Sequence, residues 1–388
     1  AQAQQTLAQS QQKSAQLAAK IATLSPAKRS LLEQKLLEQK IRPQQNGHRP
    51  AGTVLQKGTR ESAPSITEAP LSFAQQNLWL LDQLNPGNPA FNRPTHIRLT
   101  GHLDISALEA SLTQLVHRHE VLRTHFQLSA AGEPVQIILP SLPAKISLAE
   151  TLEDFSHLPA QAQEQVLKQR AIAQANTLFD LTTLPLFTVR LLRLSATEHI
   201  LLCTFHHIIF DGWSTNILLQ DLAALYRAAA TGQPAGLPAL AIQYAEFARR
   251  QQRSLQTRAM ATQLAYWKNQ LSGQLPILEL PTDRPRRSAT ATQGAEYVFE
   301  LSQSLKAQLS VFAQREHATL FMVLLAGFKT LLYRYTQADD VIVGSPIAGR
   351  NTVETENLIG LFFNTLILRT GPTGAQSFQA YVQQVRQT

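Results

Sequence analysis

Apolar residues recur with strand-like and helix-like spacing from about residue 71 onward. Short apolar runs bounded by turn residues indicate strands, and apolar positions three and four apart indicate amphipathic helices. These patterns predict strands over 94–101, 134–139, 186–194 and 198–205, and helices over 104–119, 160–177 and 213–228. The last two strands are separated only by a short turn, which predicts a central hairpin. Asp104 is the expected N-cap of its helix.

The second half repeats this alternation of strands and helices without close sequence identity to the first half. Helical regions are expected over 242–271, 302–316, 319–336 and 377–388, and strands over 295–301, 340–349 and 362–370. The pattern predicts an α/β (α+β) fold of two similar lobes with a cleft between them. We expect three parts, namely an N-terminal helical arm and linker over 1–65, a first lobe over 66–240 and a second lobe over 241–388.

The N-terminal part has a different composition. Residues 1–22 are rich in Gln and Ala, and Ser25 and Pro26 then begin a predicted amphipathic helix over 25–41. The following stretch to about residue 70 is rich in Gly, Pro and Ser, which is typical of a linker. Two interpretations of the helix stay open: a linker helix that packs on a preceding domain, or a docking element for a separate protein.

Charge and composition argue against nucleic acids and membranes as partners of this chain. The chain of 388 residues has a net charge of +8, but residues 1–70 alone hold ten Lys and Arg against four Asp and Glu. The lobes are therefore almost neutral, which argues against a nucleic-acid partner. No apolar run is long enough to span a membrane. The single cysteine, Cys203, cannot form an internal disulfide, so we expect a cytoplasmic protein. We also expect the protein to be a monomer.

The stretch LLCTFHHIIFDGWSTNILL, residues 201–219, places polar groups at the end of an apolar strand. Neighbouring strand residues point to opposite faces, so His206 and His207 should not enter one cavity, which argues against a shared zinc site. A neutral histidine can accept a proton at pH 7. A buried Asp211 would need a cation or several donors, and Gly212 permits a tight turn. The alternative is a set of satisfied polar groups in the core.

This motif, His-His-x-x-x-Asp-Gly, resembles the signature of the condensation domains of non-ribosomal peptide synthetases. Further blocks are similar to those of the family, in the same order: LSFAQQNLWLLDQL (71–84), RHEVLRTHF (118–126), IQYAEFARRQ (242–251), GSPIAGR (344–350) and LIGLFFNTLILR (358–369). Asn77 stands where the family usually has arginine. Heterocyclisation domains lack both histidines, epimerisation domains continue differently after Asp-Gly, and plant-type acyltransferases carry an Asp-Phe-Gly-Trp-Gly block that is not found here.

The resemblance implies two chloramphenicol-acetyltransferase-like lobes in a V-shaped pseudo-dimer with a tunnel at their junction. Two later blocks of the family are missing, so we expect an incomplete second lobe. Upstream and downstream carrier proteins would deliver a donor thioester and an acceptor amine on phosphopantetheine arms, with no metal and no cofactor bound directly. The implied reaction is amide-bond formation in peptide or hybrid peptide–polyketide biosynthesis, with an L-configured donor favoured. Neighbouring synthetase or polyketide synthase subunits would dock through residues 1–41. A non-catalytic docking or gating module is the alternative.

The resemblance also implies a role for each site residue. His207 would be the catalytic base or would position the acceptor amine, and the backbone N–H of Gly212 would stabilise the oxyanion. His206 would pack inside the lobe, while Asp211 would hold the loop through a salt bridge to Arg123. The expected tunnel walls include Trp213, Ser214 and Asn364.

Overall fold

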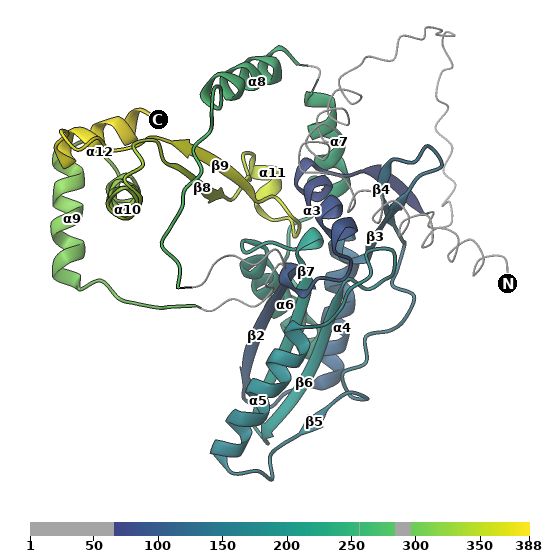
Figure 1. Cartoon of the computed structure of the whole chain (residues 1–388). Helices are drawn as coiled ribbons and strands as arrows, with labels where there is room; N and C mark the ends of the chain where they lie inside the picture. The colour runs from purple at the N-terminus through teal and green to yellow at the C-terminus, as the bar shows by residue number, and fades with distance from the viewer. Residues whose placement is uncertain (1–65, 256, 284–295) are drawn as a thin grey trace, which may run out of the picture.

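The computed structural model describes residues 66–255, 257–283 and 296–388 (Figure 1). The predicted N-terminal arm and linker, with the helix over 25–41, lie outside these residues. Within the described part of the chain, no helix is long and apolar enough to cross a membrane.

A four-stranded sheet forms the centre of the first half of the chain. Its order is β2-β7-β6-β5, with β2 at Asn92–Thr100, β5 at Glu153–Asp154, β6 at Phe187–Ser195 and β7 at Glu198–His206. Strands β2 and β6 both run antiparallel to β7, so the predicted hairpin is confirmed. The strong pairing follows from β7, which is buried along almost its whole length.

Helices cover this sheet in Figure 1. They are α4 (Ile105–Arg118), α5 (Ala160–Ala175) and α6 (Ser214–Thr231), close to the predicted bounds. Helix α4 packs along α6, and α5 contacts β2 and β7. The side chain of Asp104 caps α4 by accepting a hydrogen bond from the Ala107 N–H, as predicted.

A second, three-stranded sheet lies beside the N-terminal helix α3 (Phe73–Leu84). Its order is β1-β4-β3, with β1 at Thr67–Pro70, β3 at Thr124–Leu128 and β4 at Pro134–Ile138. Helix α7 (Tyr244–Ser254) packs on β1. The sequence pattern predicted β4, which is mostly apolar, but not β1, which has no large apolar side chain, or β3, in which only Phe126 and Leu128 are apolar.

The rest of the chain forms a smaller body that contains a two-stranded antiparallel sheet. Its elements are α8 (Arg258–Gln270), α9 (Gln303–Arg315), α10 (Leu320–Thr336), β8 (Ile342–Ile347), α11 (Val353–Glu356), β9 (Asn364–Arg369) and α12 (Phe378–Gln387). The predicted helical region over 242–271 is two helices, since Thr257 starts a new helix by capping α8. The expected strand over 295–301 is wrong for 296–301, whose apolar side chains are exposed and have no strand partner among the described residues.

Each of these bodies has its own main hydrophobic core. The larger core is built mainly from the first half, but it also includes Ile242, Tyr244, Leu358, Ile359, Leu361 and Phe362. The smaller core joins α9, α10 and α12. Residues from both sides of position 241 therefore complete the first core, and the expected division at that position stays a prediction.

Candidate active site

The histidine motif lies where β7 ends and α6 begins. His206 is the last residue of β7, a short 3₁₀ helix follows over His207–Ile209, and α6 starts at Ser214. Strand β2 pairs with this end of β7, with Asn92 opposite His206. The strand-to-helix junction predicted from the sequence is therefore present.

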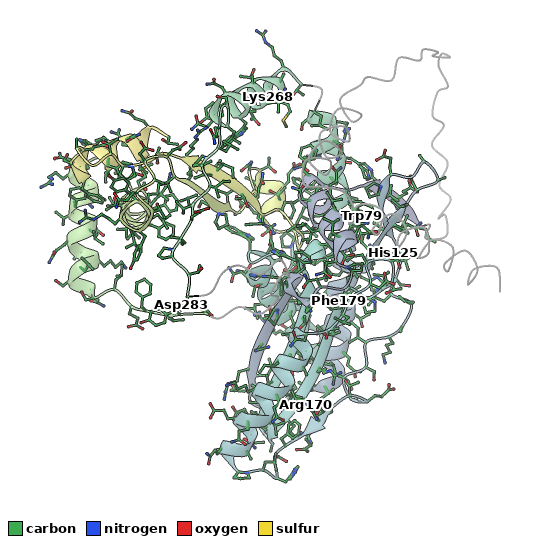
Figure 2. The ribbon with its side chains drawn as sticks, in the orientation of Figure 1. Trp79, His125, Arg170, Phe179, Lys268 and Asp283 are labelled. Carbon is green, nitrogen blue, oxygen red and sulfur yellow. The ribbon has the colours of Figure 1, made fainter. Side chains whose placement is uncertain are left out.

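His206 is enclosed in the first core, with 2% of its surface exposed. Its ring lies edge-on to Phe91 and to Phe179, which Figure 2 labels, at centroid distances of 6.2 and 6.1 Å. The Ile208 N–H donates to its Nδ1 at 3.2 Å. Burial lowers the pKa of His206 to about 4, so the ring is neutral at neutral pH. These contacts suit the packing role expected for it.

His207 has different neighbours. Its Nδ1 lies 2.7 Å from the Phe210 carbonyl oxygen. Because a carbonyl only accepts, Nδ1 carries the hydrogen, and neutral His207 has its lone pair on Nε2. The ring stacks on Phe363 with centroids 6.0 Å apart. Burial lowers the pKa of His207, the Phe210 carbonyl opposes this, and the charge of Arg93 lowers it further. At neutral pH, His207 can therefore accept a proton at Nε2.

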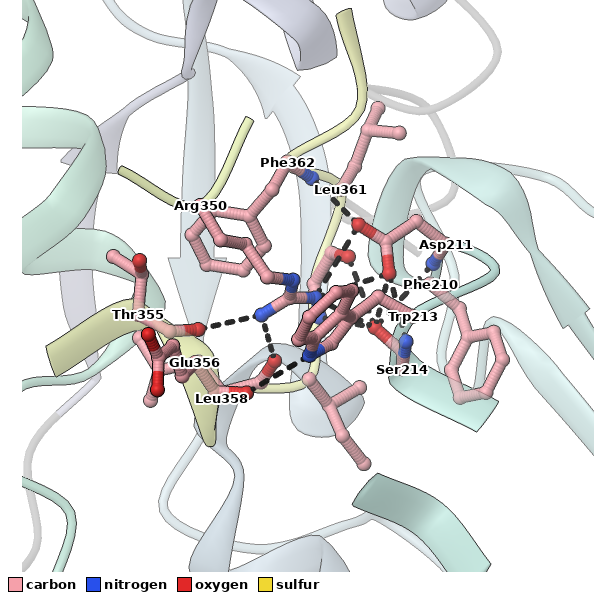
Figure 3. Close-up of polar contacts among 12 residues, drawn as sticks. Phe210, Asp211, Trp213, Ser214, Arg350, Thr355, Glu356, Leu358, Leu361 and Phe362 are labelled. Atoms are coloured by element: carbon pink, nitrogen blue, oxygen red, sulfur yellow. Dashed lines mark hydrogen bonds and ion pairs between the residues drawn. The ribbon is translucent and has the colours of Figure 1, made fainter. Parts of the chain in front are cut away.

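Asp211 is buried and bound on all sides (Figure 3). Its oxygens accept from the Ser214 N–H at 2.9 Å, the Ser214 hydroxyl at 2.7 Å and the Phe362 N–H at 3.1 Å. Arg350 Nη2 lies 3.0 Å from Oδ1 and 3.3 Å from Oδ2. Asp211 thus has the cation that a buried carboxylate requires.

The predicted salt bridge between Asp211 and Arg123 is wrong. Arg123 ends a short 3₁₀ helix directly before β3, and its Nη1 donates to the Leu139 carbonyl after β4. Its side chain therefore stabilises the end of the three-stranded sheet. The true partner, Arg350, is the last residue of the GSPIAGR block.

Arg350 is almost fully buried, with 1% of its side chain exposed. Its Nη1 donates to the carbonyls of Thr355 and Leu358, both at 2.6 Å, and its guanidinium carbon lies 4.0 Å from the centre of the Phe362 ring. Burial lowers the pKa of Arg350, and Asp211 opposes this shift. The buried ion pair therefore joins the histidine loop to the segment between β8 and β9.

The other predicted site residues occupy distinct surroundings. Gly212 is exposed, and Arg93 Nη2 lies 3.6 Å from the position a Cβ would take. Trp213 is half exposed, and its Nε1 donates to the Glu356 carbonyl at 3.1 Å. Ser214 does not line open space: it is fully buried, and its hydroxyl bonds Asp211 and the Gly360 backbone.

A cavity of about 460 Å³ adjoins this site. It lies between α3, α7 and the segments around β8 and β9, and its lining includes Phe73, Asn77, Phe247, Arg250, Phe363 and Asn364. Since Phe363 also stacks on His207, the cavity reaches the wall of the histidine site. Its size lies within the range of small-molecule pockets. Among the described residues, no group of three His, Cys, Asp or Glu side chains could hold a metal ion.

A family model described as "Condensation domain" matches residues 65–388. The chain belongs to the condensation-domain family of non-ribosomal peptide synthetases. This condensation domain is 46% identical over 319 residues to a linear gramicidin synthase protein of Brevibacillus parabrevis, covering 82% of the chain but 6% of that protein. It is 40% identical over 372 residues to phosphinothricin tripeptide synthetase PhsC of Streptomyces viridochromogenes, covering 96% of the chain and 33% of that protein. The chain thus spans a third or less of the length of these relatives.

Solved structures show the same fold. The X-domain from teicoplanin biosynthesis aligns with a TM-score of 0.74 at 28% identity, covering 86% of this condensation domain and 71% of that chain. The first condensation domain of the calcium-dependent antibiotic synthetase aligns with a TM-score of 0.65 at 23% identity, covering 83% and 73%. The expected chloramphenicol-acetyltransferase-like fold is therefore confirmed.

Proposed function

We propose that this condensation domain forms an amide bond between a donor acyl or peptidyl thioester and an acceptor aminoacyl amine. The observation that carries the proposal is the state of His207, whose Nδ1 is held by the Phe210 carbonyl and whose Nε2 keeps its lone pair. A neutral imidazole fixed in this tautomer can accept a proton from an amine or orient it for attack. The adjoining cavity supplies room for the reacting groups.

The proposed chemistry needs only groups of the chain and the two substrates. An α-amino group has a pKa of about 7.7–8.0, so part of the acceptor is protonated at neutral pH. His207 accepts that proton, or orients the amine that has already lost it, and the nitrogen attacks the thioester carbonyl. A C–N bond forms, the C–S bond breaks, and the thiolate leaves and takes up a proton. The backbone N–H of Gly212, an exposed residue, is the proposed donor to the developing oxyanion.

Asp211 is proposed to support this geometry and not to relay protons. Its side chain accepts hydrogen bonds from Ser214, Phe362 and Arg350, and no hydrogen bond to the His207 ring is among its contacts in the described part of the chain. Arg350 therefore takes the place proposed for Arg123. An aspartate bound in this way fixes the loop that carries the histidine.

The cavity supports the proposal that phosphopantetheine arms on carrier proteins deliver both substrates. Its lining combines aromatic side chains with the amides of Asn77 and Asn364, which can accept and donate hydrogen bonds along an amide-containing arm. Trp213, half exposed beside the histidine loop, is a further proposed wall residue. The relatives are multidomain synthetases, which supports carrier domains as partners. Docking of neighbouring subunits through residues 1–41, a monomeric state and a cytoplasmic location complete the proposal.

The test compares His207→Ala with His206→Ala in amide formation between two loaded carrier proteins. We expect His207→Ala to lose most of the product and to melt like the parent, because its ring is only partly buried. His206→Ala should chiefly lower the melting temperature, since it leaves a hole beside Phe91 and Phe179. An active His207→Ala variant would overturn the proposal, and a parent chain that forms no amide would favour a non-catalytic module.

A further inference from the structure

Five consecutive residues between α11 and β9 are held by side chains, although they form neither helix nor strand. We call residues 358–362 the tethered segment. Each member has a backbone group bonded to one side chain: Leu358 O to Arg350, Ile359 N to His119, Gly360 N and O to Ser214, Leu361 O to Tyr244 and Phe362 N to Asp211. Side-chain bonds to every residue of an irregular segment restrain its backbone.

The tethered segment is followed directly by the residue that packs against the proposed catalytic histidine. Its four large side chains, on Leu358, Ile359, Leu361 and Phe362, are buried in the first core. The next residue, Phe363, stacks on the His207 ring and lines the cavity. A shift of the segment would therefore move the ring that packs against His207.

His119 binds this segment through one defined tautomer. The ring is 1% exposed, and its Nε2 lies 2.8 Å from Asp221 Oδ2, which also accepts from Arg118 Nε at 2.8 Å. Because these bonds keep Asp221 ionised, Nε2 must carry the hydrogen. Nδ1 is then free to accept the Ile359 N–H, 3.4 Å away.

We propose that His119 is a positioning residue for amide formation, which fixes the tethered segment at Ile359 and thereby holds Phe363 against His207. The inference rests on the proposed function, in which His207 is the catalytic group. It adds a residue that touches neither substrate nor His207. His119 acts through the segment, and Asp221 acts by fixing the tautomer of His119.

Protonation of His119 would remove the interaction, because a second N–H would then face the Ile359 N–H. The charged groups that face the ring are Asp221, which favours the imidazolium, and Arg118 and Arg350, which oppose it. Burial is the largest effect and lowers the pKa of His119. The ring therefore stays neutral, and the acceptor is present, throughout the neutral range.

Two near-isosteric replacements of His119 separate its bond to the Ile359 N–H from its bond to Asp221. In His119→Asn the amide oxygen can take the place of Nδ1 and accept the Ile359 N–H, while the bond to Asp221 is lost. In His119→Gln the amide reaches the place of Nε2 and can donate to Asp221, while the bond to Ile359 is lost. His119→Leu loses both. His199→Leu is the matched control, since His199 is also buried in the first lobe but lies at the far end of β7.

The full chain and the four variants are assayed for amide formation at saturating carrier substrates, with a thermal melt of each protein. We expect kcat to fall roughly ten- to a hundredfold in His119→Gln and His119→Leu, and His119→Asn to recover most of it. His199→Leu should lose melting temperature without losing kcat. Recovery by Gln instead of Asn, or kcat values that follow the melting temperatures in all four variants, would overturn the inference.

Hydrogen exchange gives a second measurement that does not need the reaction. The backbone amides of Ile359, Gly360 and Phe362 should exchange at least several times faster in His119→Leu and His119→Gln than in the parent and in His199→Leu. Unchanged exchange in His119→Leu would contradict the positioning role. A parent chain without amide-forming activity but with the expected exchange pattern would contradict the proposed function alone.

Discussion

Replacing Arg350 by methionine removes the cation that faces Asp211 and keeps most of the apolar contact over the Phe362 ring. Asp211 loses contacts of 3.0 and 3.3 Å to the guanidinium, and the carbonyls of Thr355 and Leu358 lose their donor. We expect Arg350→Met to destabilise the fold strongly, because the remaining carboxylate stays buried.

The magnitude follows from these contacts. Breaking a buried ion pair by removing one partner costs about 3–5 kcal/mol. For the pair of Asp211 and Arg350 we use the lower end of this range, about 3 kcal/mol, since Asp211 keeps three hydrogen bonds from Ser214 and Phe362. Each lost bond to a carbonyl adds about 1 kcal/mol. The total of about 5 kcal/mol corresponds to a fall in melting temperature on the order of 10 °C.

Urea unfolding of Arg350→Met, Asp211→Asn and the double variant measures the coupling between the two side chains. We expect a coupling energy of about 2 kcal/mol or more, since residues in one buried network couple strongly. The same cycle with Arg123→Met should give a coupling within about 0.5 kcal/mol of zero, because Arg123 binds the Leu139 carbonyl instead. Arg369→Met is the control for a partly exposed ion pair, with Asp340, and should cost less than the loss of Arg350. Negligible coupling of Arg350 to Asp211, or stronger coupling of Arg123, would refute this reasoning.

Three further predictions concern charge and exposed apolar surface. Arg93→Ala should raise the pKa of His207, so the acid limb of the pH–rate profile should move to higher pH, whereas Arg93→Lys should leave it nearly in place. Burial raises the pKa of Asp82 to about 6, so the stability that its protonated form contributes is complete below about pH 4 and is lost as the pH rises through 6. The variant Asp82→Asn should therefore raise the melting temperature at pH 7.5 but not at pH 4. An equal rise at both pH values would contradict this prediction. One face of α10 exposes large apolar side chains, so Phe321→Ser combined with Phe328→Ser should reduce binding of the dye ANS without lowering the melting temperature.

The sequence predicted the elements whose pattern is local. The buried runs of β6 and β7 and the capped helix α4 carry their own signals, and the structure has them within a few residues. The exposed stretch at 296–301 shows the limit of this reasoning, because a run of β-prone residues needs a strand partner to become a strand.

The partner of Asp211 could not be predicted from the sequence by the same means. The sequence shows that a buried carboxylate needs a cation, but it offers Arg123 inside the block RHEVLRTHF as well as Arg350 at the end of the block GSPIAGR. The choice between them depends on the backbone path after each arginine. The chain enters β3 directly after Arg123, whereas Gly349, with a φ of 67°, turns the chain so that Arg350 can reach the histidine loop. Long-range contacts of this kind are set by tertiary packing.

The tethered segment has a consequence for the exchange of condensation lobes between synthetases. A chimera joined near residue 241 would take the first core from one parent and its last four large apolar residues from another. Those residues, Leu358, Ile359, Leu361 and Phe362, would have to fit a core with which they had not evolved. Recombined enzymes of this architecture should therefore inherit residues 350–363 together with the first lobe, even when the flanking strands β8 and β9 come from the other parent.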